Sequence, residues 1–198
     1  DNGRVKFSGS EYSGWLIQGF SENIKSFQEH AKFTGCFTFV DTKIRNTKIN
    51  FINSYCEDAI NFIRVKGDVE INTSNSISDA VDADFSNITF NNVKIKNAKN
   101  DCLDLSYGNY KVSKSEFISC GDKGISAGEK SKVFLDDINL IDTKIAIASK
   151  DDAVVNLKNF SYSGNNKICF AAYRKKQEFN GGQINYYKSS NDINCKNN

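Results

Sequence analysis

Apolar residues of the chain recur in columns that are spaced by about 22 residues. One column consists of Val81, Leu103, Ile125, Ile147 and Phe170. A second column consists of Phe90, Val112, Leu135 and Leu157, and a third of Ile95, Phe117, Leu140 and Tyr162. A fixed period of this length is the signature of a repeat architecture, so the pattern predicts stacked coils of about 22 residues.

Within each coil, apolar and polar residues alternate, as at Val133 and Leu135. A period of two predicts strands, and the residues between them, such as Asn91 and Asn92, favour turns. Leucine-rich repeats have a similar length, but their Leu-rich consensus and their helix are absent. The pattern therefore predicts an all-β, single-stranded parallel β-helix with three short strands per coil. We expect right-handed winding, because parallel crossovers usually have that hand.

The length of 198 residues fits one domain that spans the whole chain, 1–198. Regular coils are expected over 35–176, an irregular N-terminal coil or cap over 1–34, and a C-terminal coil or cap over 177–198. Caps are expected because a solenoid exposes unpaired strand edges at both ends. Residues 17–34 are expected to form a protruding loop or a short capping helix, and Trp15 to fill the core nearby.

Charge and hydropathy exclude two classes of partner. The 26 basic and 24 acidic residues give a net charge of +2, which argues against the one-sign face that nucleic-acid binding requires. No run of 18 apolar residues occurs, so no membrane-spanning segment is expected. The chain begins at Asp1 without Met, from which we expect a processed product.

The cysteine count is even, which favours an oxidising compartment and thus a secreted, periplasmic or cell-surface protein. Sequential pairing, one of 15 connectivities, would join neighbouring coils through Cys36–Cys56, Cys102–Cys120 and Cys169–Cys195. Alternatively, several cysteines are small buried residues of the core. A zinc site is not expected, because the chain has a single His and no CxxC pair.

One strand column carries outward-facing charge. If Val81 and Ala83 face the core, Asp82 and Asp84 face outward, and the same alternation places Asp104 outward. Asn61, Asp82 and Asp104 then form one row with neighbours about 4.8 Å apart. Two carboxylates at that separation repel by roughly 3 kcal/mol at an effective dielectric near 20, so the row requires compensation. The candidates are a bound Ca²⁺, backbone N–H groups, or four cations on the same face: Arg64, Lys123, Lys130 and Lys150.

A second set of acids has a structural interpretation. Asp58, Asp79, Asp101 and Asp122 recur at strand starts, where an Asp side chain typically caps a turn. The mid-strand acids have no turn to cap and indicate a groove for a polar ligand. The predicted ligand-binding residues are therefore Asn61, Arg64, Asp82, Asp84, Asp104, Lys130 and Lys150.

The segments SDAVDADF, NDCLDLS and GDKGISAGEKS resemble the repeats of right-handed parallel β-helix proteins of the pectate-lyase-like superfold. They are similar in particular to uncharacterised bacterial secreted or surface β-helix proteins, and the resemblance covers roughly 35–176. The resemblance implies a protein that binds or cleaves polysaccharides.

The enzymatic members of that superfold match only in part. Polygalacturonase-like members combine several Asp residues with a Gly-His-Gly and an Arg-Ile-Lys turn; this chain has neither turn, and its only histidine is His30. Pectate-lyase-like members bind Ca²⁺ through Asp and use Arg or Lys as the base. By that likeness, the three mid-strand acids would hold Ca²⁺ with Arg64 or Lys130 nearby, but no catalytic motif matches residue by residue.

Three functions follow as hypotheses. The first is a protein that binds an acidic or polar polysaccharide along the charged sheet. The second is a structural or adhesive surface module that contacts another surface protein and has no small-molecule site. The third is a polysaccharide lyase or glycoside hydrolase, so whether the chain is an enzyme stays open, as does its oligomeric state.

Overall fold

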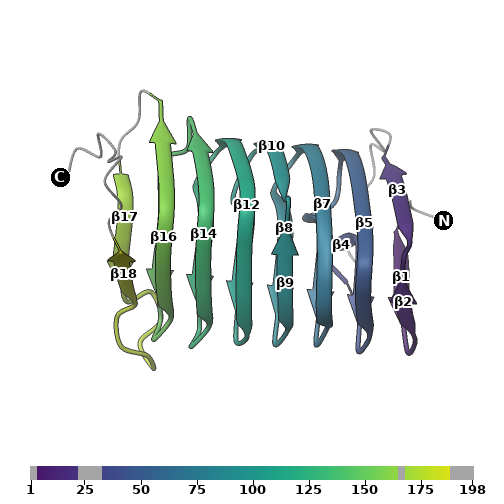
Figure 1. Ribbon diagram of the computed structural model, residues 1–198, viewed down its shortest axis with the longest axis horizontal. Coiled ribbons are helices and arrows are strands. Elements are labelled where there is room, and N and C mark those ends of the chain that lie inside the picture. Colours follow the sequence, from purple (N-terminus) through teal and green to yellow (C-terminus); the bar gives the residue numbers. More distant parts are fainter. Residues whose placement is uncertain (1–3, 22–32, 165–167, 188–198) are drawn as a thin grey trace.

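The computed structural model describes residues 4–21, 33–164 and 168–187 of the chain. These residues form strands and turns, and they contain no helix. Among them, accordingly, no helix is long and apolar enough to cross a membrane. The strands wind into a parallel β-solenoid, which confirms the predicted all-β fold (Figure 1).

One wall of the solenoid, called sheet A here, contains one strand from each successive coil. Its strands in spatial order are β1 (Val5–Ser8), β4 (Gly35–Val40), β6 (Asp58–Ile63), β8 (Asp79–Asp84), β11 (Leu103–Ser106), β13 (Lys123–Gly128), β15 (Ile145–Lys150) and β17 (Ile168–Tyr173).

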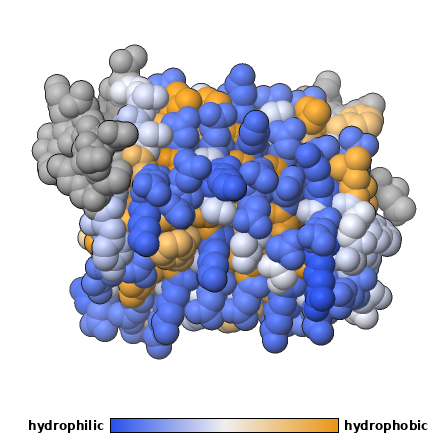
Figure 2. Space-filling view, in the orientation of Figure 1, coloured by the Kyte–Doolittle hydropathy of each residue, from blue (hydrophilic) through white to orange (hydrophobic). Residues whose placement is uncertain are grey.

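The other wall, sheet B, contains the remaining strands and forms the front of Figure 1. Its strands are β2 (Glu11–Ser13), β3 (Leu16–Phe20), β5 (Lys43–Ser54), β7 (Lys66–Ser76), β9 (Asn87–Asn91), β10 (Lys94–Ala98), β12 (Asn109–Cys120), β14 (Lys132–Ile141), β16 (Val154–Ser163) and β18 (Gln183–Tyr187). The outer face of this wall is mostly hydrophilic, with smaller hydrophobic patches (Figure 2).

The predicted columns are the observed register. In sheet A, Val81 pairs with Leu103, and Leu103 pairs with Ile125. The second predicted column, which includes Val112 and Leu135, and the third, which includes Phe117 and Leu140, both lie in sheet B and are in register throughout. The column residues face inward into one continuous apolar core along the solenoid axis, so the 22-residue period determines both the pairing and the core.

The second and third strands predicted for each coil are merged in most coils. They are separate elements only as β2 and β3 and as β9 and β10. In other coils a residue with left-handed φ lies between the two segments, as at Lys114 (50°), Asp137 (58°) and Asn159 (42°). The chain turns at this residue while the flanking residues stay paired. A coil therefore has three segments but only two hydrogen-bonded sheets.

Asparagine side chains connect successive coils at a second turn. Asn75 Nδ2 donates to Asn53 Oδ1 over 2.9 Å, and Asn97 Nδ2 donates to Asn75 Oδ1 over 3.0 Å. All three residues have a left-handed φ near 58°, a conformation that Asn tolerates better than most residues. The abundance of Asn in the sequence thus has a structural explanation.

Two of the predicted disulfides are present, Cys36–Cys56 and Cys102–Cys120. Their sequence separations of 20 and 18 residues are shorter than a coil, so each bond closes one coil rather than joining neighbouring coils. The third predicted pair includes Cys195, which lies outside the described residues. Two disulfides indicate an oxidising, extracellular environment.

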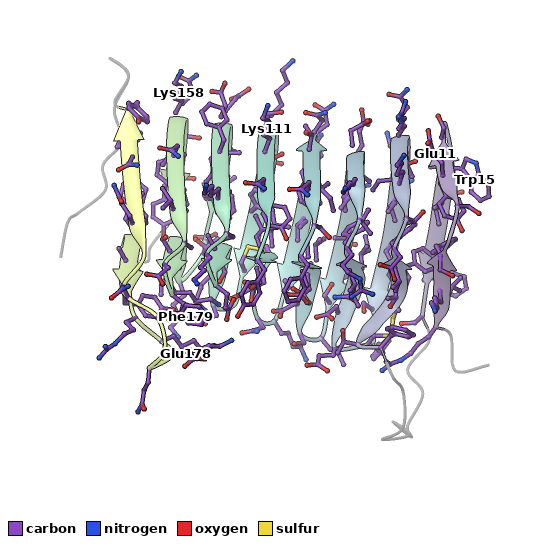
Figure 3. The ribbon with its side chains drawn as sticks, turned by 90° about the horizontal axis from the view of Figure 1, so that it is seen from below. Glu11, Trp15, Lys111, Lys158, Glu178 and Phe179 are labelled. Carbon is purple, nitrogen blue, oxygen red and sulfur yellow. A yellow bond between two sulfur atoms is a disulfide. The ribbon has the colours of Figure 1, made fainter. Side chains whose placement is uncertain are left out.

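The N-terminal part is more regular than we expected. The segment 5–20 forms a further coil, in which β1 pairs with β4, and β2 and β3 pair with β5. Trp15 does not fill the core: it lies at the N-terminal end of the solenoid, 49% exposed, with its ring edge-on to Tyr12 (Figure 3). A loop or capping helix was expected over 17–34, but residues 17–20 belong to strand β3. Most of the rest of that segment, 22–32, lies outside the described residues. At the other end, β18 extends sheet B.

Candidate functional site

The outward row predicted from the alternation exists on sheet A. Asn61 pairs with Asp82, Asp82 with Asp104, and Asp104 with Ser126, which extends the row by one coil. The flanking residues of each strand, such as Leu103, belong to the core, so the row faces away from it. We call Asn61, Asp82, Asp104 and Ser126 the polar row.

Several polar atoms of this row have no hydrogen-bond partner. Asn61 is only 1% exposed; its Nδ2 donates to Asp82 Oδ2 over 2.8 Å, but its Oδ1 has no partner. Asp104 Oδ1 and Ser126 Oγ are also buried without a partner. A buried acceptor without a donor costs about 1–3 kcal/mol, so these atoms favour a bound hydrogen-bond donor.

Two lysines compensate one end of the row. The Lys150 side chain, 5% exposed, runs back along the solenoid axis and places Nζ 3.6 Å from Asp104 Oδ2. Gly128 makes room for it, because a Cβ at that position would lie 2.8 Å from Lys150 Cε. Lys123 Nζ lies 3.3 Å from Asp101 Oδ1 and also pairs with Asp122. The predicted contribution of Lys150 to this face agrees with its position.

The two other predicted cations do not compensate the row. Arg64 lies at the corner after β6, with 54% of its side chain exposed, and forms a bidentate pair with Asp41 at 2.6 and 2.8 Å. Lys130 Nζ lies 5.7 Å from the centroid of the Phe179 ring. Both residues have a left-handed φ at a corner, which interrupts the in–out alternation on which the prediction depended.

The other end of the site is therefore acidic. We call Asp58, Asp79, Asp82, Asp84, Asp101 and Asp104 the acidic cluster. In the part of the chain that the structure describes, Asp101 and Asp104 form ion pairs with lysine, whereas the four remaining members form none.

Burial and mutual repulsion shift the pKa values of these acids upward. Burial raises the pKa of Asp58 to about 7 despite a hydrogen bond with Thr34 that lowers it, and Asp79 raises it further. Burial raises the pKa of Asp79 to about 6. The pKa of Asp82 rises well above its usual range through burial and then through the carboxylate of Asp84. Near neutral pH these groups share protons or require a cation.

Two of the strand-start acids accept hydrogen bonds from the backbone of the next coil, rather than from their own turn as expected. Asp79 Oδ1 accepts from the backbone N–H of Asp101 over 2.7 Å, and Asp101 Oδ1 accepts from that of Lys123 over 2.9 Å. Each carboxylate thus fixes the next coil. Asp122 is held by Lys123 and by Lys144, the latter over 3.2 Å. The carboxylates of Asp79, Asp101 and Asp122 already have partners within the protein, so they are less available to a ligand.

The calcium hypothesis gains no geometric support. Among residues 4–21, 33–164 and 168–187, no group of three or more His, Cys, Asp or Glu side chains converges closely enough to hold a metal ion. Asp82 and Asp104 lie on adjacent coils and Asp84 lies two residues further along β8. Their oxygens are spread along the sheet rather than directed at one point.

A row of aromatic rings, two exposed and one half-buried, borders the site and was not predicted from the sequence. Phe85 and Tyr107 follow β8 and β11 directly and stack at 4.6 Å with an interplanar angle of 6°. Phe179 lies edge-on to Tyr107 at 6.4 Å. We call Phe85, Tyr107 and Phe179 the aromatic ridge. It lies on the opposite side of the molecule from Lys111 and Lys158, as the position of Phe179 in Figure 3 shows.

The backbone at this ridge is unusual. Phe85 and Tyr107 have φ values of 52° and 48°, where a bulky side chain costs about 1–3 kcal/mol. Phe85 is nevertheless 53% exposed, so burial of the ring does not explain its presence. The equivalent positions in earlier coils hold Asp41 and Arg64. Two aromatic residues 22 apart at a turn position were the sequence signal for this ridge.

The site combines a row of hydrogen-bond acceptors, an excess of carboxylates and an adjacent apolar ridge. Such a surface suits a ligand with many donors and a partly apolar outline. No protein-family model matches the chain, and no curated protein matches it either. The resemblance to the pectate-lyase-like superfold is therefore supported for the solenoid architecture alone.

Proposed function

We propose that this protein is a secreted or surface β-solenoid that binds a polysaccharide along the outer face of sheet A. The observation that carries the proposal is the set of buried acceptors without partners, Asn61 Oδ1 and Asp104 Oδ1. Sugar hydroxyl groups supply donors for such atoms, and hydrogen bonds to charged acceptors contribute about 1.5–3 kcal/mol each. Successive members of the polar row are about 4.8 Å apart along the solenoid axis, and such a regular spacing suits a polymeric ligand.

The charge of the site favours a polar glycan over an acidic one. Asp82 and Asp84 form no ion pair within the described residues, and the lysines nearest to the polar row are already paired with Asp101 and Asp104. A uronate carboxylate placed on this surface would meet net repulsion. We therefore narrow the expectation of an acidic or polar glycan to a polar one.

The binding test is the double substitution Asp82→Asn and Asp84→Asn. Both acids have raised pKa values, Asp82 chiefly through burial, so the amides should be tolerated by the fold. Asp104 is the wrong residue to change, because its loss would leave Lys150 buried without a counter-charge. The matched control is Asp68→Asn with Asp136→Asn on sheet B, which removes the same charge elsewhere.

Binding to a panel of immobilised polysaccharides should decrease about tenfold or more in the sheet A variant and stay unchanged in the sheet B control. If wild-type protein binds no glycan in the panel, the proposal is wrong. The alternative of a structural or adhesive module without a small-molecule site then becomes the better explanation.

One observation favours a hydrolase as the second candidate. Asp82, with its raised pKa, lies in register with Asp104, which forms an ion pair with Lys150. Two adjacent carboxyl groups in unlike surroundings are the arrangement that glycoside hydrolysis uses. Release of reducing ends from a bound glycan, lost on Asp82→Asn, would support it. Ultraviolet absorbance from unsaturated uronates would indicate a lyase instead.

A further inference from the structure

The acidic cluster contains more negative charge than its lysines can neutralise. Lys123 and Lys150 are each paired with one member, Asp101 and Asp104. The side chains of the other members, Asp58, Asp79, Asp82 and Asp84, form no ion pair within the described residues. They lie on two adjacent coils, because Asp58 pairs with Asp79 and Asn61 with Asp82. A cationic group is the complement of this surface.

A second, independent feature points to the same ligand chemistry. Asn61 is 99% buried and is directed at the cluster by its own 2.8 Å bond to Asp82, yet its Oδ1 accepts nothing. Asp104 Oδ1, two coils away, is a second buried oxygen that accepts no hydrogen bond, although the Asp104 side chain as a whole is 23% exposed. Both atoms are acceptors, so a group that brings several N–H or O–H donors would satisfy them. An ammonium has three donors and a positive charge.

The aromatic ridge sets the outline of the ligand beyond its charge. Phe85 follows Asp84 directly and stacks on Tyr107, so an apolar edge runs parallel to the acidic cluster over two coils. A sugar ring has one polar rim and one apolar face, and it can contact both features. A bare cation uses only the carboxylates.

We propose that the sheet A face binds an amine-bearing sugar polymer, with the ammonium groups at Asp82 and Asp84 and the ring faces against Phe85 and Tyr107. This inference rests on the proposed polysaccharide-binding function and names its substrate class. Acetylation of the amine would remove both the charge and two of the donors, so it should weaken binding strongly.

The test compares two oligosaccharides that differ only at the nitrogen, chitosan oligomers with free amines and chitin oligomers with acetamides. We expect wild-type protein to bind the chitosan oligomer at least about tenfold more tightly at about pH 6, where an amine of ordinary basicity is charged. The Asp82→Asn and Asp84→Asn variant should lose most of that preference, and the Asp68→Asn and Asp136→Asn control should retain it.

A charge-neutral variant separates recognition from simple attraction. Asn61→Thr replaces the unpartnered amide oxygen with a hydroxyl on a shorter side chain and leaves the charge unchanged. Thr38 already holds the equivalent row position one coil earlier, so the fold should tolerate the substitution. We expect several-fold weaker binding of the chitosan oligomer. Tetralysine serves as the non-sugar cation and should bind less tightly than the oligosaccharide.

The outcomes are distinguishable. Equal or tighter binding of chitin oligomers would overturn this inference while leaving polysaccharide binding intact. Preference for alginate would overturn it as well. Tetralysine binding as tight as chitosan would show a general cation surface and overturn the assignment to a sugar. Binding of no glycan at all would remove the proposed function together with the inference.

Discussion

At the scale of single residues, the turns of this solenoid depend on left-handed backbone conformations. Asn92, Asp137 and Asn159 occupy one turn column, with φ values of 51°, 58° and 42°. Asn and Asp tolerate this region because their short side chains bond locally. Lys114 occupies the same column at 50°, exposed and without that advantage. The column therefore contains one residue that is not suited to its conformation.

Lys114→Asn should stabilise the protein by about 0.5–1 kcal/mol, because it removes most of the left-handed strain and deletes no contact. Denaturant unfolding measures this effect: the midpoint should rise, while the dependence of the free energy of unfolding on denaturant concentration stays the same. The control is Lys111→Asn, at an extended position of the same strand, β12. It should give no gain in stability, because Asn is unfavourable in strands. An equal gain in both variants would mean that loss of a lysine, not relief of strain, is responsible.

At the scale of elements, each described disulfide closes a single coil. Cys102 and Cys120 lie at the start and the end of one coil, with Cα atoms 5.5 Å apart. In the preceding coil the residues in register are Ala80 and Ala98, which pack there without a crosslink. Alanine at both cysteine positions therefore has a precedent within the same solenoid.

Cys102→Ala combined with Cys120→Ala should fold but lose about 3 kcal/mol of stability, the value that chain entropy gives for a loop of 18 residues. Far-ultraviolet circular dichroism should show unchanged strand content, and the urea midpoint should fall. A midpoint equal to that of the wild type would indicate that stacking alone holds this coil closed.

The sequence predicted sheet register better than side-chain direction. Columns such as Val81 with Leu103 were readable because a core in a solenoid repeats with the chain. The direction of the Lys150 side chain could not be predicted in detail, because it depends on the space that Gly128 leaves in the preceding coil. Arg64 was misplaced for a related reason: its corner conformation ends the alternation. The repeat period predicts which residues form a row, whereas the directions of corner residues and of long side chains depend on local packing that the period does not reveal.

At the scale of the whole molecule, the acidic cluster opposes folding near neutral pH. Burial raises the pKa of Asp58 to about 7 and that of Asp79 to about 6, whereas both are near 3.8 without burial. Between those limits the folded state binds more protons than the unfolded state, so stability must decrease as pH rises. The decrease begins above about pH 4 and is complete slightly above pH 7.

We expect the free energy of unfolding to be lower at about pH 7.5 than at about pH 5, by on the order of 2–4 kcal/mol. Asp79→Asn should reduce this difference, because the amide still accepts from the backbone of Asp101 but cannot ionise. Denaturant unfolding at the two pH values measures both effects.

Asp122 supplies a control of opposite sign. Partial burial acts to raise the pKa of Asp122, but hydrogen bonds and ion pairs with Lys123 and Lys144 lower this pKa overall. Its ionised form therefore stabilises the fold above the unfolded pKa near 3.8, and that contribution is lost only as pH falls further. Asp122→Asn should lower stability equally at about pH 5 and about pH 7.5 and leave the slope between them unchanged. If instead Asp122→Asn flattens the slope and Asp79→Asn does not, the pH dependence originates outside the acidic cluster, and the cluster is neutralised by a partner in solution.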